Sequence, residues 1–85
     1  MATGGKATIR LEFLLQKQVS TLFEALTPEV NAPVTRRANI RLQKDGLFLE
    51  LVIEADDTVA LRATLNSYLR WINSTVNVMN ALEHV

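Results

Sequence analysis

The stretch ANIRLQKDGLFLELVI, residues 38–53, decides the fold of this 85-residue chain. Asp45-Gly46 lies between two apolar-alternating runs and is a strong signal for a two-residue hairpin turn. Folding the chain at this dipeptide places Lys44 opposite Leu47, and every later pair follows in the same register. The sequence therefore predicts an antiparallel hairpin whose second strand covers 47–55.

Both faces of the predicted hairpin support this register. On one face, Arg41 opposes Glu50 and Arg37 opposes Glu54, and such cross-strand charge pairs contribute about 0.2–1 kcal/mol each. A slip by one residue would move every side chain to the other face. The other face pairs apolar residues only: Leu42 with Leu49, Ile40 with Leu51, and Ala38 with Ile53.

The residues before the hairpin predict one strand and one helix. Apolar residues alternate with polar ones over 7–13, the period of a half-buried strand. Residues 16–26 carry apolar side chains at helical spacing, and Pro28 is expected to end that helix. Residues 31–35 are expected to form a loop. A flexible leader is expected over 1–6, ahead of a single domain over 7–85.

These elements predict an α+β fold with two layers and the order β-α-β-β-α. The strand over 47–55 is the most apolar and is expected to lie in the middle, giving a three-stranded antiparallel sheet of order 1-3-2 with two helices on one face. The edge of the strand over 7–13 would then be open to another chain.

The last predicted helix runs from Asp57 to about Leu82, which at ~1.5 Å per residue makes it longer than the sheet. Its apolar arc covers about half of the circumference, more than a one-sided core contact requires. Either the first helix packs on the outer part of this arc, or a helix of a partner does. Under the second alternative the partner-binding residues are Ala60, Thr64, Ser67, Trp71, Val78 and Leu82.

Composition excludes several classes of function. The chain has no cysteine and a single histidine, so thiolate or histidine metal sites are not expected, nor is any cofactor. No catalytic grouping is found either, since Asp56 and Asp57 are adjacent acids of the kind that cap helices. The net charge of zero argues against nucleic-acid binding by bulk charge. So small a domain is expected to gain stability by oligomerisation.

The basic residues Arg36, Arg37 and Arg41 form a cluster with Lys44 along one strand. This cluster is either a solvated face or a local phosphate contact within a larger RNA-binding surface.

The motif LNSYLRW at 65–71, with IEADD at 53–57 and ALRA at 60–63, resembles the Pcc-type small subunit of the KEOPS complex. Weaker similarity runs through ALTPE at 25–29 and TRR at 35–37. The first predicted strand departs from the family pattern, because Leu14-Leu15 stands where a proline is usual.

This resemblance implies a non-catalytic, cytoplasmic subunit that dimerises and binds the catalytic threonylcarbamoyltransferase of KEOPS through its helices. It also implies help in engaging tRNA, for threonylcarbamoylation of the adenosine next to the anticodon. Some archaea carry two related small subunits, so the second chain could be an identical copy or a paralogue. A free-standing RNA-binding domain is the alternative.

Overall fold

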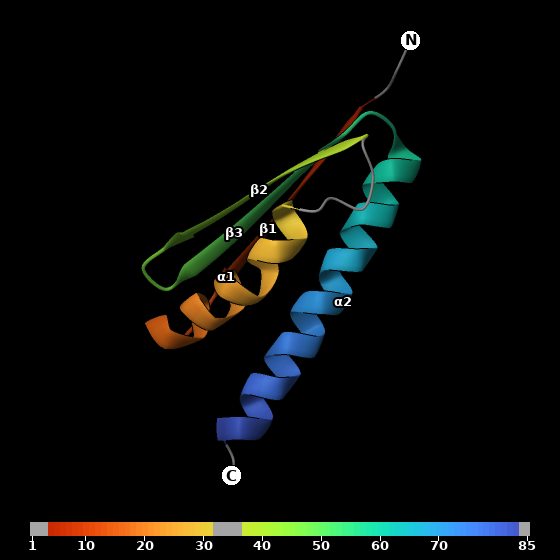
Figure 1. The fold of residues 1–85 in the computed structure, drawn as a ribbon. Coiled ribbons are helices and arrows are strands. Elements are labelled where there is room, and N and C mark those ends of the chain that lie inside the picture. The colour runs from red at the N-terminus through yellow and green to blue at the C-terminus, as the bar shows by residue number, and fades with distance from the viewer. Residues whose placement is uncertain (1–3, 32–36, 84–85) are drawn as a thin grey trace.

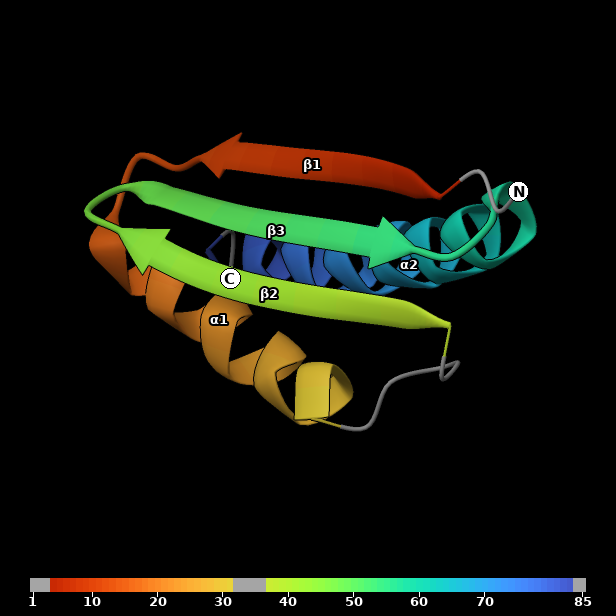
Figure 2. The same ribbon diagram turned by 90° about the horizontal axis from the view of Figure 1, so that it is seen from above.

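The computed structural model describes residues 4–31 and 37–83, with only the backbone described for 81–83. Three antiparallel strands form a sheet of order β1-β3-β2, and the two helices lie against one face of it (Figures 1 and 2). The predicted α+β class, the β-α-β-β-α order and the central third strand are thus confirmed. The elements are β1 (Gly5–Glu12), α1 (Gln16–Asn31), β2 (Ala38–Asp45), β3 (Phe48–Ala55) and α2 (Thr58–Glu83).

Strand β1 shows the alternation that its sequence predicts. Its odd-numbered residues point toward the helices and are half-buried, while its even-numbered residues are exposed. The strand begins at Gly5, two residues before the expected start at Ala7, because Gly5 still pairs with Ala55 of β3. Strand β3 is buried more thoroughly, as its central position requires: Leu49, Leu51 and Ile53 are almost wholly inaccessible.

The predicted register of the β2–β3 hairpin is wrong by two residues. Asp45 pairs with Phe48, so the two central turn residues are Gly46 and Leu47 rather than Asp45 and Gly46. Gly46 has a φ of 58°, whereas no other described residue has a positive φ. A left-handed residue at the first central position alone is the pattern of a type II′ turn. Because the shift is even, every side chain keeps its predicted face.

Helix α1 does not end before Pro28, as the sequence led us to expect, but continues to Asn31. The apolar spacing explains the difference, because Val30 follows Leu26 by four residues and packs against the same core. The start of α1 is stabilised by Gln18, whose side-chain Oε1 accepts a hydrogen bond from the Leu15 N–H at 3.2 Å.

Helix α2 begins where its acidic start predicts. Asp57 is its N-cap, since the Oδ1 atom accepts a hydrogen bond from the Ala60 N–H at 2.7 Å. Ala60 lies with Ala38 and Ala55 in a small apolar cluster, so the first turns of α2 approach the sheet closely. The later turns lie farther from the strands, beside α1 (Figure 1).

Candidate partner-binding surfaces

One side of the molecule combines an open strand edge with apolar side chains that are only partly covered. Within the part of the chain that the structure describes, β1 pairs with β3 alone. In Figure 2, α1 lies beside β2 and most of α2 lies behind β3, so β1 is covered less than the other strands, although α2 contacts it near Gly5. Ile9, Leu11 and Phe13 accordingly remain half-buried, unlike the buried residues of β3. We call this surface the β1 edge.

A row of leucines on α2 borders the β1 edge. Leu61 lies against Gly5 of β1, so closely that a Cβ atom on Gly5 would come within 2.6 Å of the leucine Cδ2. Leu65 and Leu69 follow at four-residue intervals and so lie on the same side of the helix. Exposure increases toward Leu69, which is 44% exposed. An exposed leucine at the end of this row extends the apolar surface from β1 onto α2.

The six residues predicted to bind a partner are placed differently from one another. Ala60 and Thr64 are buried inside this chain, at 1% and 0% exposure, so their packing partners are the chain's own sheet and core. Ser67 and Trp71 are half-buried, and Val78 is 57% exposed. The Leu82 side chain lies outside the described residues. Partner binding at Ser67, Trp71 and Val78 stays a prediction.

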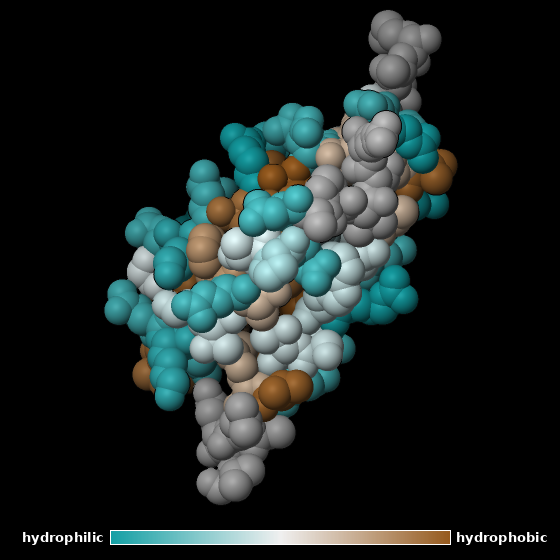
Figure 3. Space-filling view, viewed as in Figure 1, coloured by the Kyte–Doolittle hydropathy of each residue, from teal (hydrophilic) through white to brown (hydrophobic). Residues whose placement is uncertain are grey.

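Trp71 packs against the most deeply buried aromatic residue of the chain. Its ring meets the Tyr68 ring edge-on, with the centroids 5.0 Å apart and an interplanar angle of 80°. Seen from the side of Figure 1, a band of white to brown side chains runs down the middle of the molecule between teal margins (Figure 3). The helical face is therefore less hydrophilic than its borders.

Two hydroxyl groups beneath this face have no hydrogen-bond partner among the residues that the structure describes. They are Thr64 Oγ1 and Tyr68 Oη, and both side chains are fully buried. Burial, together with the nearby Glu29 carboxylate, raises the pKa of Tyr68 to about 12. Tyr68 therefore stays neutral at physiological pH and serves as a packing residue.

The predicted basic cluster is engaged with acidic residues. Arg37 forms an ion pair with Asp57 at 2.7 Å, and Arg41 forms one with Glu54 at 3.3 Å. Both arginines were expected to have acidic partners, but the predicted ones, Glu54 for Arg37 and Glu50 for Arg41, are wrong because of the two-residue register shift. Arg36 lies outside the described residues.

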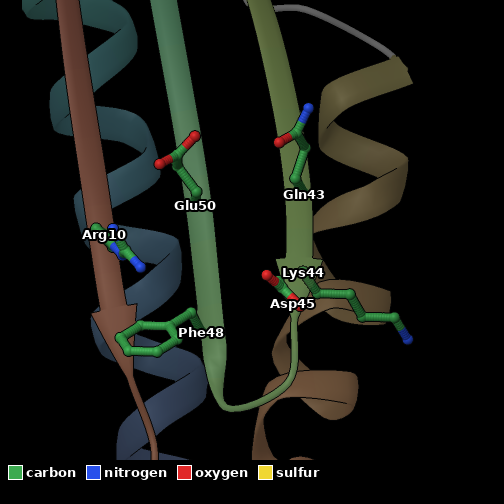
Figure 4. Close-up of a pocket in the computed structure, with 6 residues that line it drawn as sticks. All are labelled: Arg10, Gln43, Lys44, Asp45, Phe48 and Glu50. Atoms are coloured by element: carbon green, nitrogen blue, oxygen red, sulfur yellow. The ribbon is translucent and has the colours of Figure 1, made fainter.

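The outer face of the sheet carries a shallow hollow of about 160 Å³. Figure 4 shows Phe48 and Glu50 on β3, Arg10 beside them on β1, and Gln43 and Asp45 on β2. The Arg10 guanidinium lies 4.4 Å from the centroid of the Phe48 ring, a cation–π contact. Charges of both signs line the hollow, so it does not form a positive surface for phosphates.

The described residues, 4–31 and 37–83, offer neither a metal site nor a membrane-spanning helix. These residues contain no group of three or more His, Cys, Asp or Glu side chains that could hold a metal ion. Neither described helix is long and apolar enough to cross a membrane.

The apolar arc of α2 is buried unevenly. Thr64 and Tyr68 are fully buried, whereas Leu61 and Leu65 are half-buried and Leu69 is 44% exposed. The small side chains of Ala60 and Thr64 were the signal in the sequence for which side of α2 faces the sheet, because they allow the helix to approach the sheet more closely than leucine would.

Comparisons with known proteins agree with this architecture. The family model described as "Transcription factor Pcc1" matches residues 6–80. The KEOPS complex subunit Pcc1 of Pyrococcus abyssi is 33% identical over 72 residues, which cover 85% of this chain and 88% of that protein. A crystal structure of a Gon7–Pcc1 binary complex matches the fold with a TM-score of 0.81 at 16% identity, over 92% of this chain and 95% of that one. Together, the match over most of the chain and the identity to the archaeal protein show that the chain belongs to the Pcc1 family.

Proposed function

We propose that this chain is a non-catalytic subunit of a KEOPS assembly in the cytoplasm, where it joins a second small subunit to the threonylcarbamoyltransferase. The observation that carries the proposal is the pair of partly covered apolar surfaces on a Pcc1-family domain: the β1 edge, and the face around Trp71 and Val78. A relative of similar length is named as a KEOPS subunit, which supports the assignment.

The β1 edge is the surface that we assign to the second small subunit. A strand edge with free backbone groups accepts another strand by main-chain hydrogen bonding. The half-buried Ile9, Leu11 and Phe13 would gain further burial from the same contact. A domain of this size has a small core, so burial against a second chain would also increase its stability.

The helical face is the surface that we assign to the catalytic subunit. Trp71 and Val78 lie about two turns apart on α2, and Ser67 lies one turn before Trp71. A tryptophan that keeps part of its surface exposed is the residue type most often found at the centre of protein interfaces. A helix of the catalytic subunit lying along α2 would cover all three positions.

The contribution to tRNA engagement would be limited and local. Arg36, Arg37 and Arg41 are the proposed contacts, and the latter two already pair with carboxylates. Arg37→Ala and Arg41→Ala in the assembled complex should therefore lower tRNA affinity less than about tenfold each, with a reduced salt dependence. Unchanged affinity and salt dependence would remove these residues from the tRNA contact.

The proposal is tested by the light-scattering mass of the chain, alone and mixed with the threonylcarbamoyltransferase subunit. We expect a dimer alone and a joint complex in the mixture. A chain that ignores the catalytic subunit at micromolar concentrations would refute the scaffold function.

A free-standing RNA-binding domain is the alternative. It predicts tight binding of RNA by the isolated chain, weakening steeply with salt. The net charge of zero and the mixed charges on the outer face of the sheet favour the scaffold instead.

A further inference from the structure

Phe48 lies on the outer face of the sheet, away from the helices, where its cross-strand neighbours are charged. It is half-buried and lines the hollow of about 160 Å³ described above. The residues that pair with it are Glu12 on β1 and Asp45 on β2. The hydrophobic core lies on the other face of the sheet and does not include Phe48. The ring is therefore available to a group that approaches the outer face.

The Phe48 ring already carries one guanidinium. The Arg10 Cζ atom lies 4.4 Å from the ring centroid. Arg10 also faces Glu50 across β1 and β3, yet the ion pairs among the described residues involve Arg37 and Arg41 instead. Within that part of the chain, the half-buried Glu50 carboxylate thus has no cationic partner, although it lies beside the ring (Figure 4).

The charges that line the hollow favour a cation. Glu50 and Asp45 supply two carboxylates, and Arg10 supplies one guanidinium. The Lys44 side chain extends away from them (Figure 4), and its Nζ atom lies 4.9 Å from the centroid of the Phe23 ring on α1. One negative charge therefore remains in excess, and it attracts a cation and repels a phosphate.

A planar guanidinium fits these groups better than an ammonium does. A carboxylate accepts two parallel N–H bonds from a guanidinium, and an aromatic ring stacks on its flat face. Phe48 and Glu50 are two residues apart on β3, so both side chains lie on the outer face. Gln43 faces Glu50 from β2, and its amide oxygen can accept a further N–H.

We propose that the outer face of the sheet binds an arginine side chain of a partner protein, held by the Glu50 carboxylate and stacked on the Phe48 ring. Arg10 occupies the ring in the free chain and competes with the incoming arginine. The site lies on the opposite side of the sheet from both helices (Figure 2), so it adds a third surface to the two assigned above.

Titration of the full chain with short peptides tests the proposal. The probe is a capped tripeptide with arginine between two glycines. The comparison peptides carry lysine or citrulline in its place, and citrulline replaces the guanidinium by an uncharged urea. NMR shifts of the Phe48 ring protons and the Glu50 amide report binding. We expect the arginine peptide to bind with millimolar affinity and the other two at least about fivefold more weakly.

Three substitutions separate the groups of the site. Glu50→Gln should weaken binding of the arginine peptide about fivefold or more, because it removes the charge that pairs with the guanidinium. Glu54→Gln makes the same change farther along the outer face of β3, where the carboxylate pairs with Arg41, and should alter the affinity less than about twofold. Arg10→Gln should strengthen binding about twofold or more, since it removes a like charge and a competitor for the ring. Opposite effects of two substitutions in one hollow cannot come from loss of folding.

Several outcomes would overturn the proposal. Equal affinities for the three peptides, or no shifts at millimolar concentrations, would remove the arginine site. Weaker binding by Arg10→Gln would show that the hollow takes an anion through Arg10. Shifts caused by guanosine but not by the arginine peptide would assign the Phe48 ring to a nucleobase. None of these results bears on the light-scattering test of the scaffold function, because that test depends on the other two surfaces.

Discussion

The Arg37 guanidinium lies 2.7 Å from Asp57 Oδ2, joining the residue before β2 to the first turn of α2. The other carboxylate oxygen of Asp57 caps the helix by accepting the Ala60 N–H. The Arg37 carbonyl oxygen also accepts a hydrogen bond from the Asp56 N–H at 2.8 Å. The backbone bond therefore extends the pairing of β2 with β3 by one step, and the ion pair joins the same end of the sheet to the N-cap of α2.

Asp57→Ala should lower the free energy of unfolding by about 1–2 kcal/mol, because it removes the N-cap. Asp57→Asn should cost less than about 1 kcal/mol, since it retains a capping oxygen and loses only a largely exposed ion pair. Urea unfolding of both variants gives the comparison, with Arg37→Ala as the control for the ion pair. Equal losses in Asp57→Ala and Asp57→Asn would assign the effect to charge rather than to capping.

The hairpin shows what the sequence could determine. Period-two alternation assigned every β2 and β3 residue to its correct face, because this information is repeated along both strands. The register depended on the turn alone, and both Asp45-Gly46 and Gly46-Leu47 contain the glycine that a tight turn needs. Only the left-handed φ at Gly46, with none at Asp45, distinguishes the two.

The rotation of α2 could not be predicted for a different reason. Its apolar arc is wide enough that either side could face the sheet. The choice depends on the small residues Ala38 and Ala55, which lie on two different strands and pack with Ala60. Packing across the sheet, rather than the helix pattern itself, placed Ala60 and Thr64 in the core and left Leu69 at the surface.

Tyr68→Phe should raise the free energy of unfolding by about 1 kcal/mol at pH 7, because the buried Tyr68 hydroxyl has no hydrogen-bond partner. Thr64→Val should have a similar effect for the same reason. Thermal unfolding of each variant gives the measurement. A loss of stability in Tyr68→Phe would show that the hydroxyl makes a favourable contact.

The same tyrosine predicts a loss of stability at high pH. Its pKa is about 12 in the folded chain and 10.0 without the surrounding structure. The folded chain therefore holds the proton when the unfolded chain has released it, and stability falls as the pH rises from about 10 toward 12. Below about pH 10 the tyrosine is protonated in both the folded and the unfolded chain, so its effect on stability does not change with pH. The difference in stability between wild type and Tyr68→Phe, followed from about pH 9 to about pH 11, should show this fall. A difference independent of pH would contradict it.

Pro28→Ala should raise the free energy of unfolding by about 1–2 kcal/mol. Proline inside a helix removes one backbone hydrogen bond and costs about 3 kcal/mol, partly offset because it also restricts the unfolded chain. Pro28 is exposed, so alanine leaves no cavity. Chemical denaturation compares the variant with Glu24→Ala, an exposed change in the same helix that should have little effect. A destabilised Pro28→Ala variant would show that the proline ring is needed where it lies.

Trp71→Ala separates partner binding from folding. If Trp71 anchors the catalytic subunit, the substitution should cost about 2 kcal/mol or more of binding while the isolated domain remains folded. Because Trp71 is half-buried and packs on Tyr68, some loss of stability is also expected.

Val78→Ser avoids this ambiguity, since Val78 is 57% exposed and contributes little to the core. It should weaken binding by about 1 kcal/mol without a change in unfolding. Asn80→Ser, on the exposed side of α2, is the control. Calorimetric titration measures the affinity of each variant for the catalytic subunit. If Val78→Ser and Asn80→Ser both bind as tightly as wild type and Trp71→Ala is unfolded, the Trp71 surface belongs to the core and the catalytic subunit binds elsewhere.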